Sequence, residues 1–298
     1  MARNPRLNRL NPRSNRFPSS PVFYRAFFFT LASFCGLVGW GQAGYRPAPN
    51  YITAGKPDQA EGARVLREFQ GMGISGTYWL DFELQVLPHR GEEKTIAGEL
   101  IGTRSDQGPL TRLKIGAESW LIQSGPQASA WRSRSGAKPE PLSPAQTLDP
   151  LAGTDVTLFE LQMPFLYWTD FMYEGLDRIR GRPVHRFVLY PPKDLAAARP
   201  ELTGVRVYLD TQFSALMQAE LLGSKGSVDK IISILDLKKV GERYVPKSID
   251  FRNNATRGKT RFTVRAAALD LALPEDAFDP IKLNQPATQI PAEKIQPL

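Results

Sequence analysis

Histidine, the side chain most often used for acid–base and metal chemistry, occurs only twice in the chain, at His89 and His185. Two histidines with no shared spacing cannot supply a three-ligand zinc site without help from carboxylates. The sequence contains neither an HExxH zinc motif nor a GxSxG nucleophile elbow. An ordinary structural role is therefore the favoured interpretation of both histidines, and a hydrolase would need a polar cluster that the sequence does not show.

Two glycine-rich segments resemble phosphate-binding motifs in letters but not in context. Residues 71–76 read GMGISG, the glycine spacing of a dinucleotide-binding loop. That loop must follow a strand and open a helix, whereas here a helix is expected before it and a strand after it, so we interpret it as a helix C-cap and turn. Residues 258–260 (GKT) lack the earlier glycine of a phosphate loop, because position 253 is Asn. Asp81 and Glu83 share one face of a predicted strand, where solvation accounts for them.

The first 43 residues are typical of a secretory signal peptide. They hold six arginines and no Lys, Asp or Glu, followed by an apolar run over 26–40 and the small-residue sequence Gly41-Gln42-Ala43. We predict cleavage near Ala43. A retained membrane anchor is the weaker alternative, because the run of about 15 apolar residues is shorter than the roughly 20 that a spanning helix needs.

The only cysteine, Cys35, lies inside this apolar run and follows the bulky Phe34, which disfavours lipid attachment. The mature protein is therefore expected to lack cysteine, which excludes disulfides, thiol catalysis and cysteine-ligated metal. Export without disulfides favours the bacterial periplasm.

The positive net charge lies mostly in the leader. The chain carries +8, of which six charges come from the arginines of residues 1–43, so a net charge of +2 is left for the rest. Nucleic-acid binding needs a concentrated basic surface, and none is predicted.

Residues 203–252 predict an antiparallel meander. Val205, Val207 and Leu209 alternate with Arg206, Tyr208 and Asp210, the period of two expected of a strand with one buried face. Gaps of hairpin length separate the runs. Further strands are expected at 78–86, 95–104, 110–116, 119–123, 130–133, 184–190 and 261–268.

Two helices are expected from capping and periodicity. Asp58 is a candidate N-cap with Glu61 as its capping-box partner, and a short helix over Val156–Met163 is capped by Thr154 or Asp155 and ended by Pro164. A helical turn is expected at 195–199. The segment 44–57 is predicted to be a linker, 134–150 an exposed loop, and 284–298 a loose tail.

Residues 165–173 (FLYWTDFMY) form the most aromatic stretch. We favour an aromatic plug at one end of the sheet, and a lid or mouth for an apolar ligand is the alternative. About ten strands with only two helices to cover them indicate that part of the sheet's apolar face encloses a hollow. Such a hollow suits acyl chains, which gain about 0.8 kcal/mol per buried CH₂ and need no catalytic residue.

A family resemblance rests on the order of several short motifs. These are PFLYW (164–168), GRPV (181–184), a strand ending YPP (190–192), VYLD (207–210), YVPK (244–247) and LPEDAFDP (273–280). Over roughly residues 58–283 the chain resembles the outer-membrane lipoprotein-sorting, LolA-like proteins of Gram-negative bacteria, in their broader exported branch.

The resemblance implies an α+β, mostly β fold: an unclosed antiparallel β-barrel of about 10–11 strands with helices across its mouth. It implies a non-enzymatic periplasmic carrier of lipoproteins or other lipids, without a cofactor or metal, that meets sorting partners at the inner and outer membranes. An arginine latches the lid in the classical carrier, and the motifs do not locate it here. The alternative is an envelope scaffold of the same fold without cargo. The expected cavity lining is Leu80, Phe82, Leu84, Val86, Val205, Val207, Leu209, Phe262 and Val264, with Phe159, Met163, Phe165, Trp168 and Met172 near the opening.

Overall fold

The computed structural model describes residues 45–50, 56–134 and 137–298, all within one compact unit that extends from Ala43 to Leu298. The predicted signal peptide, residues 1–43, lies outside the described residues. None of the helices in the described ranges is long and apolar enough to span a membrane.

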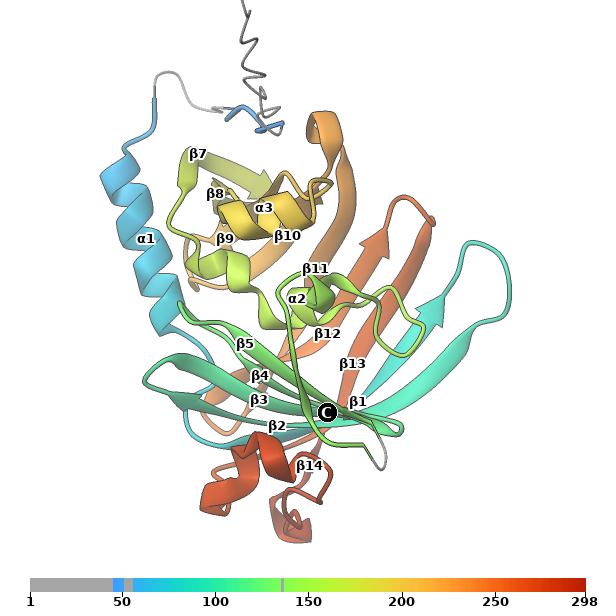
Figure 1. The fold of residues 1–298 in the computed structure, drawn as a ribbon. Helices are drawn as coiled ribbons and strands as arrows, with labels where there is room; N and C mark the ends of the chain where they lie inside the picture. The colour runs from blue at the N-terminus through green and yellow to red at the C-terminus, as the bar shows by residue number, and fades with distance from the viewer. Residues whose placement is uncertain (1–44, 51–55, 135–136) are drawn as a thin grey trace, which may run out of the picture. The chain divides into compact units, whose positions relative to one another are not determined.

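One antiparallel sheet of fourteen strands dominates the described residues (Figure 1), with the order β6-β5-β4-β3-β2-β1-β13-β12-β11-β10-β9-β8-β7 and β14 added beside β13. The two ends of this order, β6 and β7, are not paired with each other, so the sheet is not closed, as predicted. The strands are β1 (Tyr78–Leu87), β2 (Lys94–Ser105), β3 (Gly108–Ile115), β4 (Glu118–Gln123), β5 (Ser129–Arg134), β6 (Glu140–Leu142), β7 (Phe171–Ile179), β8 (Arg182–Leu189), β9 (Gly204–Asp210), β10 (Leu216–Leu222), β11 (Val228–Val240), β12 (Arg243–Asn253), β13 (Gly258–Leu269) and β14 (Gln296–Pro297).

Three α-helices accompany the sheet in the described residues: α1 (Gln59–Gly71), α2 (Leu158–Gln162) and α3 (Lys193–Ala198). The Asp58 side chain accepts a hydrogen bond from the N–H of Ala60 and so caps α1 as predicted, but Glu61 pairs with Arg64 instead of completing a capping box. The short 3₁₀ turns are η1 (Gln146–Leu148), η2 (Pro164–Tyr167), η3 (Ser224–Gly226), η4 (Glu275–Phe278), η5 (Pro280–Lys282) and η6 (Ala292–Lys294).

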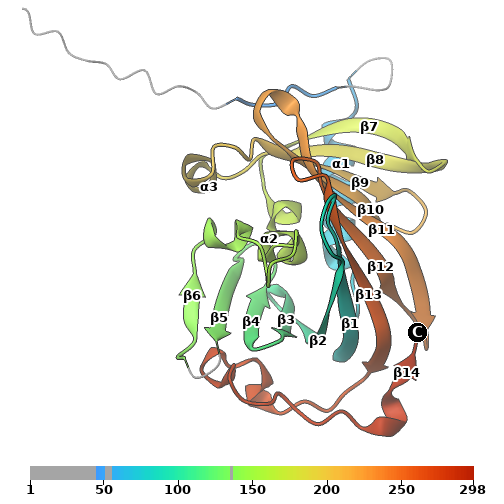
Figure 2. The same cartoon turned by 90° about the vertical axis from the view of Figure 1, so that its right-hand side faces the viewer.

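The period of two in β1 places its apolar side chains on one face. Leu80, Phe82 and Leu84 are at most 4% exposed and belong to the main core cluster. The Phe82 ring stacks on Phe262 of β13, with 4.5 Å between ring centroids. The same ring also faces Gly98 of β2, where a Cβ atom would overlap Phe82 Cζ. Only glycine at position 98 therefore allows β2 to pair with β1 opposite Phe82. Both views show α2 on this inner side of the curved sheet (Figures 1 and 2).

The described part of the predicted linker is bound to the outer side of the sheet. Arg46 forms a two-pronged ion pair with Asp170 and lies over the Tyr190 ring, 3.6 Å from its centroid. The hydroxyl of Tyr190 donates to the carbonyl of Pro47 at 2.9 Å. Residues 45–50 therefore form a docked strap, which linker-like composition did not indicate.

The C-terminal segment is also more ordered than predicted. We expected a loose tail over 284–298, but Gln296 and Pro297 pair with β13 as β14. Where β12 and β13 separate, the ammonium group of Lys247 donates to the carbonyls of Val264 and Leu298, at 2.6 and 2.8 Å. Backbone and lysine hydrogen bonds hold this segment, so its low apolar content misled the prediction.

Candidate functional site: the plug of the inner face

The segment Leu158–Trp168, which we call the plug, lies against the inner face of the sheet. Its helix α2 begins with a complete capping box between Thr157 and Glu160, three residues after the predicted Thr154. Met163 adopts a left-handed conformation, φ 49°, and ends α2, and Pro164 opens η2 immediately afterwards. The chain therefore turns sharply between two short helices, and the turn presents one compact set of aromatic side chains.

Three aromatic residues of the plug fill the inner face. Phe159, Phe165 and Trp168 are 1%, 0% and 9% exposed. Their ring centroids lie 5.6 to 6.3 Å apart in tilted and edge-on contacts. The plug that the sequence favoured is what the structure contains, and its side chains occupy the space where we expected a hollow.

The structure brings most of the predicted lining residues into one cluster, with the plug residues packed among them. Val86 is buried but lies outside this cluster, and Met172 packs with Val188, Tyr190 and Leu222 in a separate one. The partly buried Met163 packs against the main cluster, whose predicted members are Leu80, Phe82, Leu84, Val205, Val207, Leu209, Phe262, Val264, Phe159, Phe165 and Trp168.

A pocket of about 360 Å³ opens beside the plug. Phe159 and Trp168 line it from the plug, together with Tyr167, and Leu195 of α3 lines it from across the opening. The rest of the wall comes mainly from the β4–β5 turn and from the segment after β5. Of the predicted lining residues only Phe159 and Trp168 reach this pocket. We did not include Leu195 among the predicted lining residues, although we expected a helical turn at 195–199 that begins with this apolar side chain.

Ion pairing attaches the plug to the central strands. Lys230 of β11 places its ammonium nitrogen 2.6 Å from Glu160 Oε1, and the Glu160 side chain is only 1% exposed. Burial raises the pKa of Glu160, while the positive charge of Lys230 opposes that rise. Gln162 adds two more attachments by donating to the carbonyls of Gln123 and Ser129, at 2.7 and 3.0 Å.

Helix α1 is attached at both ends. Near its start, the Gln59 amide accepts from the N–H and donates to the C=O of Tyr173 on the edge strand β7, at 2.8 and 2.9 Å. At its end, Arg104 of β2 donates to the carbonyls of Gln70 and Met72, at 2.7 and 3.0 Å. Arg104 thus satisfies carbonyls that the helix leaves free, at a place where an arginine can hold α1 to the sheet.

Helix α1 also holds the plug directly. The side-chain amide of Gln70 donates to the carbonyl of Leu166 in η2, at 2.6 Å. Leu66 of α1 is 2% exposed in the same core cluster as the plug aromatics. A small number of polar contacts therefore keeps α1 and the plug together over the inner face.

The two histidines lie on different elements. His89 is exposed after β1, whereas His185 is on β8 with its Nδ1 2.8 Å from the hydroxyl of Tyr173. Burial lowers the pKa of His185, which favours the neutral ring that can share this hydrogen bond. This contact beneath α1 is a structural role of the kind that the sequence favoured.

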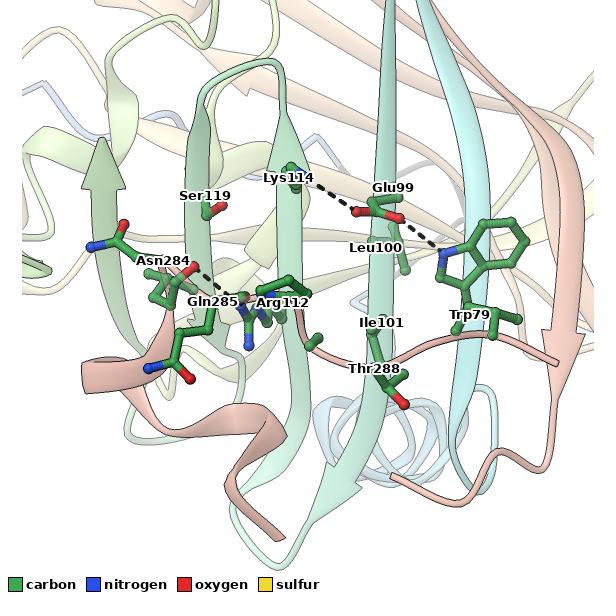
Figure 3. Close-up of a pocket in the computed structure, with 14 residues that line it drawn as sticks. Trp79, Glu99, Leu100, Ile101, Arg112, Lys114, Ser119, Asn284, Gln285 and Thr288 are labelled. Atoms are coloured by element: carbon green, nitrogen blue, oxygen red, sulfur yellow. Dashed lines mark hydrogen bonds and ion pairs between the residues drawn. The ribbon is translucent and has the colours of Figure 1, made fainter. Parts of the chain in front are cut away.

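A second, smaller pocket of about 160 Å³ lies between strands β1–β4 and the C-terminal segment (Figure 3). Arg112 on its wall is 8% exposed and donates to the carbonyls of Ala277, Lys282, Leu283 and Gln285. Its guanidinium is directed to the backbone of the C-terminal segment, so we interpret this region as a clamp for that segment.

The unclosed sheet with helices over its inner face defines the chain as LolA-like in fold. A domain assigned to the outer-membrane lipoprotein-sorting proteins, from Vibrio parahaemolyticus, is similar with a TM-score of 0.68 and 15% identity, covering 76% of this chain and 100% of that one. A DUF1329 family protein from Desulfovibrio piger has a TM-score of 0.65 and 11% identity, covering 76% and 98%. A LolA superfamily protein from Nitrosomonas europaea has a TM-score of 0.54 and 12% identity, covering 72% and 96%.

A family model described as an uncharacterized protein matches residues 135–285, half of the chain, and the chain belongs to that family. None of the curated proteins matches the sequence. At these low identities the similar structures establish the fold, which agrees with the family resemblance of the short motifs.

Proposed function

We propose that this protein is a periplasmic carrier or binding protein for lipoproteins or other lipids, and that it holds their acyl chains against the inner face of the sheet during outer-membrane sorting. The observation that supports this most is the plug: a continuous apolar face is covered by a short aromatic segment that a few polar contacts retain. A pocket already opens at the side of this segment.

Binding would be an exchange of one apolar surface for another. An acyl chain that buries ten CH₂ groups gains about 8 kcal/mol, which is of the order needed to displace several aromatic contacts and hydrogen bonds. The cluster of Leu80, Val207 and Phe262 would then contact the chain instead of Phe159 and Phe165. The pocket beside Trp168 is where the chain would first enter.

The periplasmic location rests on the signal-peptide pattern of residues 1–43, and the sorting partners at the inner and outer membranes rest on the family resemblance. The role needs no chemical step, because movement of the plug and apolar burial are sufficient. We therefore also propose that the protein is not an enzyme and uses no cofactor or metal.

Native mass spectrometry of the mature protein, isolated from its own periplasm, tests the proposal. We expect additional mass that organic solvent removes and that fragments as an acylated lipid. Protein that carries no lipid, and that does not take up a fluorescent fatty acid after delipidation, would count against a carrier role.

One observation favours the alternative of an envelope scaffold without cargo: the plug fills the inner face with the protein's own side chains. A scaffold would yield no extractable lipid but would co-purify with a stable protein partner. To separate the two, the plug aromatic Trp168 can be replaced by Ala, with Ile281→Ala, at an exposed position outside both pockets, as control. A carrier should change its lipid uptake only in the first variant.

A further inference from the structure

A third pocket, which we call the β10–β11 groove, lies where two central strands separate. Strand β10 pairs with β11 only from Gln218–Ser233 to Leu222–Val228, while β11 continues to Val240. Beyond Ser233 no strand of the described residues pairs with β11 on this side. The β9–β10 turn lies opposite, and between them is a groove of about 430 Å³.

Exposed apolar side chains are concentrated in this groove. Eight large apolar side chains are exposed in the described part of the chain, and four of them line it: Phe213, Leu235, Leu237 and Tyr244. Such a concentration is the mark of a binding surface and not of ordinary surface composition. Among the apolar lining residues, the buried Leu216 and the partly buried Ile234 pack with the main core, so apolar side chains continue from the rim of the groove into its wall, beside the buried carboxylate of Asp210.

Arg182 lines the groove together with two carboxylates, Asp210 and Asp236, and Arg180 of the same hairpin reaches its edge at Ile234. The Arg182 guanidinium is 5.0 Å from the centroid of the Phe213 ring, and its Nε lies 2.7 Å from Asp210 Oδ2. Asp210 also accepts the N–H groups of Gln212 and Phe213, so the carboxylate is already fully engaged. Arg180 donates to the carbonyl of Ile234 at 3.0 Å and remains exposed. An anion at the edge of the groove beside Ile234 would be close to the exposed Arg180, with Arg182 on the groove wall.

The neighbouring charges argue against two other occupants. A bilayer surface favours an excess of Lys and Arg, whereas here Lys238 and Lys239 lie between Asp236 and Glu242 in the sequence, and Lys239 pairs with Glu242. An added peptide strand favours a regular open edge, but β11 has a bulge between Ile234 and Asp236 and exposed lysines beyond it, both of which discourage strand addition. A single apolar chain with one charged end meets neither obstacle.

We propose that the β10–β11 groove binds one acyl chain of a lipid and holds its anionic head group against Arg180 and Arg182. The volume lies in the range of ligand sites. The inference rests on the proposed function only in that the ligand is a lipid. The groove has its own lining, distinct from that of the pocket beside the plug, so the two sites can be tested separately.

The test is isothermal titration calorimetry of the delipidated mature protein with decanoate and dodecanoate, each below its critical micelle concentration. Each added CH₂ that is fully buried strengthens binding by about fourfold, so dodecanoate, with two more CH₂ groups, should bind about 15-fold more tightly. Leu235→Asp should weaken dodecanoate at least tenfold, whereas Ile281→Asp, at an exposed position outside the groove, should not. Thermal unfolding checks that both variants fold.

Arg180→Gln should weaken dodecanoate several-fold and leave the uncharged dodecanol unchanged, with Arg178→Gln, another exposed arginine of the same hairpin, as control. Absence of binding would overturn the groove site. So would loss of binding in a plug variant, Phe159→Ser, but not in Leu235→Asp, although the proposed carrier function would then survive. Binding to phosphatidylglycerol vesicles without binding of monomeric dodecanoate would replace the proposal with membrane docking. If the protein isolated from the periplasm carries no lipid, this result counts against the carrier function, whereas calorimetric binding of dodecanoate that Leu235→Asp abolishes would still support the groove site.

Discussion

Lys230 and Glu160 form an ion pair between the central strand β11 and the plug helix α2, with 2.6 Å between Nζ and Oε1. The other carboxylate oxygen of Glu160 accepts the N–H of Thr157 at 2.8 Å and thereby caps α2. One buried carboxylate thus fixes the start of the plug helix and attaches it to the sheet. The stability of the plug is therefore linked to the charge of a single side chain.

Removing the lysine should destabilise the protein strongly. Lys230→Met leaves the Glu160 carboxylate buried without its partner, and we expect a loss of about 3–5 kcal/mol in the free energy of unfolding at pH 7. Urea unfolding measures this loss. The exposed pair Lys239–Glu242 supplies the control, because Lys239→Met should cost at most about 1 kcal/mol. Equal effects of the two variants would show that the buried pair does not retain the plug.

Acidification should act on Glu160 in the direction opposite to most carboxylates. Burial raises its pKa in the folded state above the usual 4.5, so the native protein binds this proton more readily than the unfolded chain. The contribution of Glu160 to stability should then grow as the pH falls through the raised pKa, and should be complete below about 4.5. The measurement is the difference in unfolding free energy between wild type and Glu160→Gln from pH 7.5 to pH 4. The unfolding free energy of the wild type minus that of the variant should increase as the pH falls, and a decrease on acidification would contradict the raised pKa.

The sequence was sufficient for the sheet and its buried face, because strand alternation is a local property. Leu80, Phe82 and Leu84 could be assigned to the core from the period of two, and the structure places them there. The Glu160–Lys230 pair joins residues 70 positions apart, and neither residue has a local feature that indicates the other.

The filled inner face and the bound C-terminal segment could not be predicted for the same reason. The small number of expected helices indicated that the apolar face of the sheet would be only partly covered. The burial of Phe159 and Phe165 against that face depends on the turn at Met163, which the helix count does not reveal. Likewise, the proline-rich composition after residue 283 suggested a loose tail, whereas Arg112, distant in sequence, binds the carbonyl groups of Leu283 and Gln285 where this tail begins. Long-range side-chain contacts decided both features.

Helix α1 should tolerate no side chain at Gly62. A Cβ there would lie 2.5 Å from the Cβ of Tyr173, so Gly62→Ala should push α1 away from β7 and lower stability despite the better helix propensity of alanine. Gly71, in the last turn of the same helix, has no atom within 4 Å of its Cβ position. Gly71→Ala should therefore stabilise the protein by about 0.5–1 kcal/mol. Thermal unfolding of the pair measures the two opposite signs, and stabilisation by both substitutions would refute the close contact.

Arg104 should control how readily α1 leaves the inner face. Arg104→Ala removes the donors to the carbonyls of Gln70 and Met72, so we expect faster amide hydrogen exchange in α1 and faster uptake of a fluorescent fatty acid. Arg67→Ala, an exposed position within α1, is the control for the loss of one arginine. Faster exchange without faster uptake would mean that α1 does not limit access to the apolar face.

Arg112 should determine whether the C-terminal segment stays bound. Its guanidinium replaces water for several buried carbonyls, and burial lowers the pKa of Arg112. Arg112→Met should remove at least about 2 kcal/mol of stability and expose residues 284–298 to limited proteolysis. Lys114→Met on the same strand breaks only an exposed pair with Glu99, 3.6 Å long, and should change stability by less than about 1 kcal/mol. Because β14 is held independently by β13 and Lys247, cleavage should begin between residues 284 and 295, and initial cleavage at residues 296–298 would show that the clamp at Arg112 is not the first contact to open.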